Sequence, residues 1–240
     1  MRKIKKALRT NILIFILTLL GMVSSLVLSL RAETTEEIKQ QIERLRDPDK
    51  EMRHEAFETL SGFDKSAVPT LLTALENERL KQQDETTRAW VIHGIVYALG
   101  RIGDKSVVPY LFKLLIEDKD GNVNIDATEA LCMMKDEKIV YELMKLAMQE
   151  RKNKENPMVP ISIASGLFNM GEVVIPTLMK GLEHGDWEIR YFAIGVLGQL
   201  AMNYPEYKQN LRQSFKNRLN DENAEVSALA KRCLGELSGE

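Results

Sequence analysis

A short hydrophobic pattern recurs six times along this chain and limits the folds that the chain can adopt. In each copy an aliphatic residue is followed eight positions later by leucine, and successive leucines lie 30 to 39 residues apart. Small residues are frequent four positions and one position before each leucine. Because residues four apart share a helical face, each copy predicts a helix that a neighbouring helix can approach closely. The copies are Met52/Leu60, Val91/Leu99, Val123/Leu131, Val159/Leu167, Ile189/Leu197 and Val226/Leu234.

A second helix is predicted after each of the first five copies. Pro69, Pro109 and Pro176 suit a first helical turn, where the backbone N–H has no partner to lose. Apolar residues then recur at the spacing of one buried helical face, and nothing alternates with period two. Glycine marks several of the turns between paired helices. The predicted second helices span 66–77, 105–117, 137–149, 173–183 and 206–220.

The two ends of the repeated region are predicted to act as caps. Residues 33–46 place Ile38, Ile42 and Leu45 on one helical face, which describes an unpaired N-terminal capping helix. The sixth copy has a first helix only, and Lys231 occupies a position that is mostly apolar in the earlier copies. A terminal repeat needs such a polar outer face. Residues 47–240 therefore predict an all-α solenoid with five full helix pairs and a C-terminal capping helix, about 12 helices with the N-terminal cap.

Two stretches resemble a known repeat family. The run from Asp186 to Gly198 and the run from Gly103 to Leu111 are similar to HEAT repeats of the phycobilisome-lyase-like type. This resemblance covers residues 47–240 and implies a right-handed superhelix whose second helices line the concave surface. The arginine that this family carries at the start of the first helix survives only as Arg53 and Arg190, so we expect its ladder of Asp–Arg contacts to be broken.

Residues 1–32 form a separate segment with the pattern of a signal peptide or a signal-anchor. No acidic residue precedes Glu33, and residues 10–30 carry no charge. Basic residues before an apolar run keep the N-terminus in the cytoplasm, so the remainder is expected to be exported. The basic residues are Arg2, Lys3, Lys5, Lys6, Arg9 and Arg31.

Cleavage of this segment stays open on the sequence. Its length favours a retained hydrophobic helix that spans the inner membrane through residues 11–30. Small residues at Gly21 and at Ser24–Ser25 favour cleavage instead. Either way, we expect the repeats to be periplasmic or otherwise extracytoplasmic.

The net charge of −2 hides two opposite contributions. Residues 1–32 hold six basic and no acidic residues, whereas residues 33–240 hold 27 basic and 35 acidic ones. An acidic exported domain is a poor ligand for nucleic acid. We therefore expect no nucleic-acid partner.

No catalytic, cofactor-binding or metal site is expected. His54-Glu55 resembles the His-Glu repeats of deoxyhypusine hydroxylase, a HEAT-type di-iron enzyme, but glycine follows both His93 and His184, so only one such pair exists. Cys132 and Cys233 lie in the third and sixth copies. In a solenoid each repeat contacts only its neighbours, so we expect both to be buried packing residues without a disulfide.

One surface column is the candidate site. Three lysines occur in register on the second helices, and in a solenoid they would align as a basic groove for an acidic peptide, unless they are ordinary solvated lysines. Trp90 and Trp187 are expected to pack on neighbouring copies. The column residues are Thr73, Lys113, Lys145, Lys180 and Asn217, with Tyr110 beside them.

The function hypothesis is an exported, membrane-tethered HEAT-repeat scaffold that binds an unidentified protein through its concave surface. One alternative is a HEAT-type enzyme or enzyme subunit, either a metal-dependent hydroxylase using His54 or a bilin-lyase-like protein. Another is a purely structural tether or assembly factor. No small-molecule substrate is expected for the scaffold.

Overall fold

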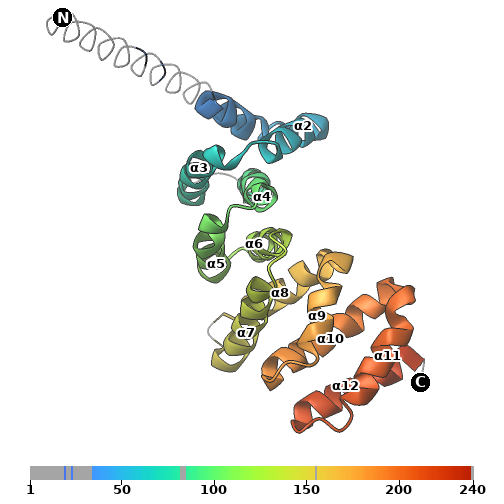
Figure 1. Ribbon diagram of the computed structural model, residues 1–240. Helices are drawn as coiled ribbons and strands as arrows, with labels where there is room; N and C mark the ends of the chain where they lie inside the picture. The colour runs from blue at the N-terminus through green and yellow to red at the C-terminus, as the bar shows by residue number, and fades with distance from the viewer. Residues whose placement is uncertain (1–18, 20–22, 24–33, 82–84, 155, 239–240) are drawn as a thin grey trace, which may run out of the picture.

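The computed structural model describes residues 34–81, 85–154 and 156–238, together with Leu19 and Val23. Within these residues the chain forms α-helices and short 3-10 turns but no strand (Figure 1). A helix over 34–44 comes first, and two alternating sets follow. The first helices are α2 (Lys50–Ser61), α4 (Glu85–Ile102), α6 (Gly121–Met133), α8 (Met158–Asn169), α10 (Trp187–Asn203) and α12 (Ala224–Ser238). The second helices are α3 (Val68–Leu80), α5 (Val108–Glu117), α7 (Glu137–Asn153), α9 (Ile175–Gly181) and α11 (Lys208–Asn217).

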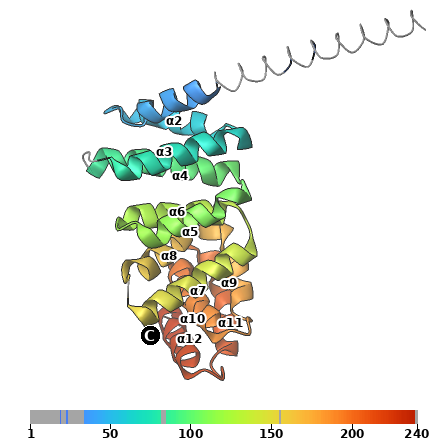
Figure 2. The same ribbon diagram turned by 90° about the vertical axis from the view of Figure 1, so that its left-hand side faces the viewer.

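The helices stack in two layers. The first helices α2, α4, α6 and α8 pack on one another in order, and each second helix packs against the first helix that follows it. Figure 1 shows α3, α5 and α7 along one side of the stack, and Figure 2 looks onto that side. The predicted all-α solenoid of about 12 helices is therefore confirmed.

The predicted N-terminal hydrophobic helix lies outside the described residues, apart from Leu19 and Val23. In the part of the chain that the structure describes, no helix is both long and apolar enough to cross a membrane.

Local sequence explains where the helices begin and turn. Aspartate caps several first turns; Asp186, for example, accepts a hydrogen bond from the Glu188 N–H. The prolines of the second helices lie at their first or second positions, as predicted. Gly103 and Gly171 have φ angles of +66° and +52°, a region that favours glycine. The corresponding turn before α7 holds Lys135 at φ 51°.

One continuous apolar core runs through the described stack. The pattern leucines from the first copy to the fifth have no exposed surface, while Leu234 in the last copy is half-buried. Ile38, Ile42 and Leu45 are buried, so the helix over 34–44 covers the N-terminal end of the core as expected.

Small residues let the first helices approach closely. A Cβ atom added to Gly100 on α4 would lie 2.7 Å from the Cα of Ala130 on α6. A Cβ added to Gly166 on α8 would lie 2.6 Å from the Cβ of Thr128. Real side chains do not pack at such distances, so glycine is required for this helix spacing.

The regular stacking changes between α8 and α10. Here α10 packs against α7 and α9 as well as α8, and α7 also contacts α9. The first-helix layer therefore does not continue uniformly, and the repeats on either side of this step are packed differently.

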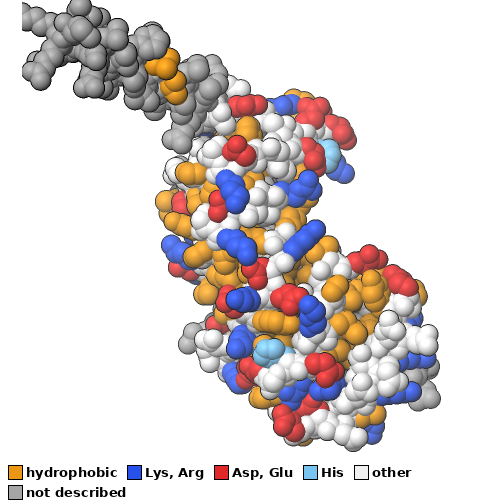
Figure 3. Space-filling model, viewed as in Figure 1, with side chains coloured by type: hydrophobic (Ala, Val, Ile, Leu, Met, Phe, Trp, Pro, Cys, Tyr) orange, Lys and Arg blue, Asp and Glu red, His pale blue; other side chains and the backbone are white. Residues whose placement is uncertain are grey.

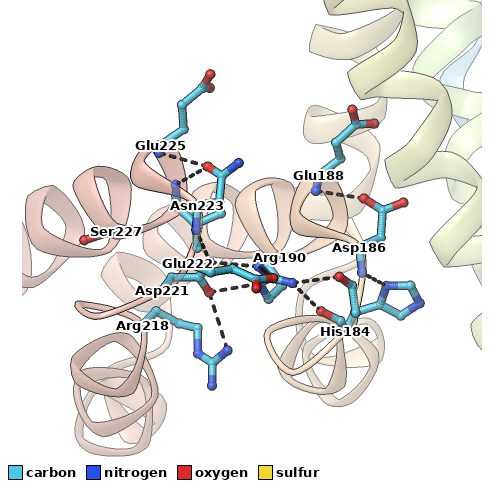
Figure 4. A network of polar contacts seen from close by, with 12 residues as sticks. His184, Asp186, Glu188, Arg190, Arg218, Asp221, Glu222, Asn223, Glu225 and Ser227 are labelled. Carbon is cyan, nitrogen blue, oxygen red and sulfur yellow. Dashed lines mark hydrogen bonds and ion pairs between the residues drawn. The ribbon is translucent and has the colours of Figure 1, made fainter.

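A buried arginine joins the last two first helices. Arg190 has only 4% of its surface exposed, and it donates from Nε and Nη2 to the Asp221 carboxylate at 2.9 and 2.8 Å. Its Nη1 donates to the carbonyl groups of His184 and Gly185 at 2.8 and 3.0 Å. Figure 4 shows Arg190 between the loop that precedes α10 and the loop that precedes α12. The contact fixes one loop against the other.

The other repeats use different contacts. Arg53, in the position equivalent to Arg190, donates to the carbonyl groups of Asp47 and Pro48 and forms no ion pair within the described residues. Arginines from other positions take its place elsewhere. They form the pairs Arg46–Glu78 at 2.6 Å and Arg88–Asp118 at 3.0 Å. The prediction of a broken Asp–Arg ladder is confirmed.

Gly100→Ala is expected to destabilise the protein, because the added methyl group forces α4 and α6 apart. Overpacking of this kind costs about 1–3 kcal/mol. Gly235→Ala on α12 is the matched control, since a Cβ there meets nothing within 4 Å. The control should gain about 0.5–1 kcal/mol from helix propensity. Urea denaturation measures both, and equal effects of the same sign would contradict the close-packing account.

Asp221→Asn is expected to destabilise the protein by about 3 kcal/mol at pH 7, because it leaves Arg190 buried without its carboxylate. Burial works to raise the pKa of Asp221, but hydrogen bonds from Arg190 and the Asn223 N–H and the charge of Arg218 lower it below its ordinary value. A carboxylate whose pKa is lowered on folding stabilises the folded state at pH values above its unfolded pKa. This contribution is lost as the pH falls through the folded pKa.

The difference in unfolding free energy between wild type and Asp221→Asn should therefore narrow as the pH falls below about 4, the ordinary pKa of aspartate. Glu222→Gln is the control, because Glu222 contacts Arg190 with a side chain that is 83% exposed. Its effect should stay below about 0.5 kcal/mol. If the difference in unfolding free energy between wild type and Asp221→Asn stayed constant with pH, the ionised Arg190–Asp221 pair could not be its cause.

Candidate functional site

The predicted column residues all lie on the second helices and are all exposed. They come from α3, α5, α7, α9 and α11, and we call the surface formed by these helices the second-helix face. Tyr110 is the large aromatic residue among them, with 48% of its surface exposed. The exposed column residues are Thr73, Tyr110, Lys113, Lys145, Lys180 and Asn217.

Each lysine of the column lies close to a carboxylate. Lys145 on α7 is 3.8 Å from Asp186, the residue that caps α10, and Lys180 on α9 contacts Glu137 on α7. Lys113 lies 3.9 Å from Glu117, four positions along α5. Figure 3 shows basic and acidic side chains side by side along this part of the surface. The column is a mixed-charge surface, with a carboxylate beside every lysine.

Lys145 and Lys180 belong to one cluster. The Tyr141 ring of α7 lies 5.3 Å from the His184 ring, beside the two lysine–carboxylate pairs. Glu137 raises the pKa of Lys180, because its carboxylate stabilises the ammonium form. Burial and the Glu137 charge raise the pKa of Tyr141. This group of residues joins α7, α9 and the start of α10 on the second-helix face.

Lys113 belongs to a separate polar cavity. With Glu117 it lines a space of about 590 Å³ between α3, α4, α5 and the loop that precedes α6. Asp118 is buried there and pairs with Arg88 at 3.0 Å and with Arg79 at 3.6 Å. The structure therefore divides the predicted column between two clusters. Glu117 was visible in the sequence, four residues after Lys113, but the partners of Lys145 and Lys180 depend on helix packing.

An apolar groove lies where the first-helix layer changes. Its volume is about 440 Å³, and Figure 3 shows hydrophobic side chains gathered over this region of α8 and α10. Arg151 lies at its edge, 4.6 Å above the Tyr191 ring, and Met202 is 60% exposed. No sequence signal marked this groove, because it depends on how α10 departs from α8. Its apolar lining includes Ala147, Met148, Pro160, Ala164, Tyr191, Phe192, Val196 and Met202.

A third cavity lies between α2 and α4, and we call it the α2–α4 pocket. Its volume is about 270 Å³. Trp90 packs on the preceding copy as expected, with the Arg53 guanidinium 4.0 Å from its ring centre, yet 38% of it stays exposed. A signal was present in the sequence, since the lining residues of α2 and of α4 recur at helical spacing. The lining residues are Leu45, Lys50, Arg53, His54, Phe57, Trp90 and His93.

The candidate metal-binding pair and the two cysteines have structural roles. Glu55, next to His54, pairs with Arg44 at 2.7 Å. Among the described residues, no three side chains of His, Cys, Asp or Glu gather into a group that could hold a metal ion. Cys132 and Cys233 are buried and unpaired, as predicted. Burial raises the pKa of Cys132 to about 12 and that of Cys233 to about 11.

The stacked helix pairs define the chain as a helical-repeat solenoid, a class of protein that presents long continuous surfaces to partners. Two family models extend this: HEAT repeats match residues 78–153, and a single HEAT repeat matches residues 174–204. The chain is a HEAT-repeat protein, and such repeats build protein-interaction scaffolds.

Comparisons with whole proteins add no function. No curated protein matches the chain. The solved complex of CpcE and CpcF of phycocyanin lyase from Nostoc sp. PCC7120 is 22% identical, with a TM-score of 0.33, over 82% of this chain and 96% of that one. Human deoxyhypusine hydroxylase in complex with glycerol is 16% identical, with a TM-score of 0.35, over 87% of this chain and 98% of that one. Both TM-scores are low, so neither likeness carries a conclusion about this chain.

His93→Gln is expected to remove a pH-dependent part of the stability. His93 Nδ1 lies 2.7 Å from Asp126 Oδ1, and this hydrogen bond, with the charges of Asp126 and Glu129, raises the pKa of His93 against the effect of burial. A histidine whose pKa is raised on folding stabilises the folded state at pH values below its unfolded pKa of about 6.5. This contribution is lost as the pH rises through the folded pKa.

Thermal melts from pH 6 to pH 8.5 should therefore show wild type losing stability relative to His93→Gln. The loss should be less than about 1 kcal/mol, because the imidazole is half exposed to water. Asp126→Asn should flatten the profile in the same way. Parallel profiles for all three proteins would show that the pair does not titrate in this range.

Proposed function

We propose that this protein is an exported, membrane-tethered HEAT scaffold that binds a partner protein through its second-helix face. The observation that carries the proposal is the exposure of all six column residues, although they come from five different helices. A solenoid surface built from successive repeats can contact one partner at many positions along its length.

The chemistry of this face favours a partner with charges of both signs. Lys145 and Lys180 lie beside Asp186 and Glu137, so a partner meets donors and acceptors in alternation. Charged groups of this kind contribute mainly to the selection of a partner and to the rate of association. Tyr110 offers an aromatic group, the type of residue that is enriched in protein interfaces.

Export and tethering rest on the N-terminal segment. Basic residues up to Arg9 followed by the uncharged run of residues 10–30 orient the chain with the repeats outside the cytoplasm. A retained span would attach the repeats to the membrane by a short connection to the helix over 34–44. A tethered scaffold meets its partners at a raised local concentration.

A photocrosslinking amino acid at Tyr110, in the full chain in its own cells, is expected to capture one discrete partner. The same group at Ile161 on α8 is the control, because Ile161 is 58% exposed but lies on a first helix. The crosslinked species should be found in the membrane fraction. Capture from Ile161 alone would overturn the assignment of the face, and a crosslinked species in the cytosol would overturn the proposed export.

Reversing Lys145 and Lys180 to glutamate should reduce the Tyr110 crosslink by about tenfold or more, because charge complementarity is lost. A swap variant, Lys180→Glu with Glu137→Lys, keeps the internal ion pair but exchanges its charges. If the partner contacts Lys180, the swap variant should be as stable as wild type, but its Tyr110 crosslink should still be reduced. An undiminished crosslink in the double-reversal variant would exclude these lysines from the interface.

A further inference from the structure

The α2–α4 pocket is basic, although the domain around it is acidic. Residues 33–240 hold 27 basic and 35 acidic residues, yet every ionisable side chain that lines this pocket belongs to lysine, arginine or histidine. Lys50 and Arg53 have no carboxylate within 4.0 Å in the ranges that the structure describes. By contrast, Lys113, Lys145 and Lys180 each have one. Lys50 and Arg53 therefore carry positive charge that no neighbouring carboxylate compensates, and such charge concentrates anions.

The guanidinium of Arg53 is already fixed for binding. Its Nη1 donates to the carbonyl groups of Asp47 and Pro48 at 2.7 and 3.0 Å, and its Cζ atom lies 4.0 Å from the centre of the Trp90 ring. Among the described residues its Nε and Nη2 have no partner, so these donors remain for a ligand. A side chain that is held before binding loses little entropy when the ligand arrives.

The walls of the pocket offer flat apolar surface beside these cations. Phe57 lies 4.2 Å from the Tyr97 ring and 5.6 Å from the His93 ring, measured between ring centres, so its position is fixed by α4. Trp90 is partly exposed at the other wall, and the buried Leu45 completes the lining. A volume of about 270 Å³ is suited to a single small ring.

We propose that the α2–α4 pocket binds a small phosphate monoester that carries a flat apolar group. Lys50 and Arg53 hold the phosphate, while the ring of the ligand lies against Phe57 and Trp90. Two permanent cations match the charge of a phosphate monoester better than that of a carboxylate, which is a monoanion. The pocket lies on the first helices, so this site is independent of partner binding on the second-helix face.

Tryptophan fluorescence tests the proposal directly, because Trp90 and Trp187 are the two tryptophans of the chain. In the full chain carrying Trp187→Phe, titration with phenyl phosphate should change the fluorescence of Trp90 saturably. Inorganic phosphate, benzoate and the neutral benzyl alcohol should each bind at least about tenfold more weakly. Inorganic phosphate lacks the ring, benzoate carries one charge fewer, and benzyl alcohol carries no charge. No saturable change with phenyl phosphate, or equal binding of inorganic phosphate, would overturn the proposal.

Lys50→Gln is the decisive variant, since Lys50 is exposed and its replacement leaves the core untouched. It should weaken phenyl phosphate binding by about tenfold, the loss expected for one charge-assisted hydrogen bond. Arg53→Lys should also weaken binding, because a lysine cannot reproduce the stacked planar fork. Lys216→Gln on α11, at the far end of the solenoid, is the matched control and should bind as wild type does. Unchanged affinity in Lys50→Gln would exclude the pocket as the binding site.

Discussion

The close approach of successive first helices is the constraint on which the rest of the structure depends. Gly100 lies against Ala130 and Gly166 lies against Thr128, in each case so closely that a Cβ atom on the glycine would clash. This spacing brings the leucines of neighbouring repeats into one core, and the second helices are then carried along in register. The second helices α3, α5 and α7 form one shared surface because these contacts keep their repeats in line.

The sequence predicted the architecture well because each signal was repeated. Leucine spacing, prolines at the start of second helices and glycines at the turns are local features, and six copies of the leucine pattern reinforce one another. The burial of Ile38, Ile42 and Leu45 and of both cysteines also followed from periodicity. The departure of α10 from α8 could not be predicted in this way, because it depends on how three helices pack against one another.

The surfaces were only partly predictable for the same reason. The exposure of Lys113, Lys145 and Lys180 followed from helical position, but the carboxylates beside Lys145 and Lys180 come from other elements. The α2–α4 pocket combines residues some 40 positions apart, and its basic and aromatic side chains belong together only once α2 lies against α4. A prediction of single helices does not bring such groups into contact.

The polar contacts between repeats differ from one interface to the next, and this has a consequence for how the protein can change. Arg190 meets Asp221, Arg88 meets Asp118 and Arg46 meets Glu78, each from a different position in its repeat. Deleting or duplicating an internal repeat would therefore leave a buried charge without its partner, whether the cation of Arg190 or the carboxylate of Asp118 or Glu78. Unlike an array of identical units, this solenoid has a fixed length and order, and its repeats are not interchangeable.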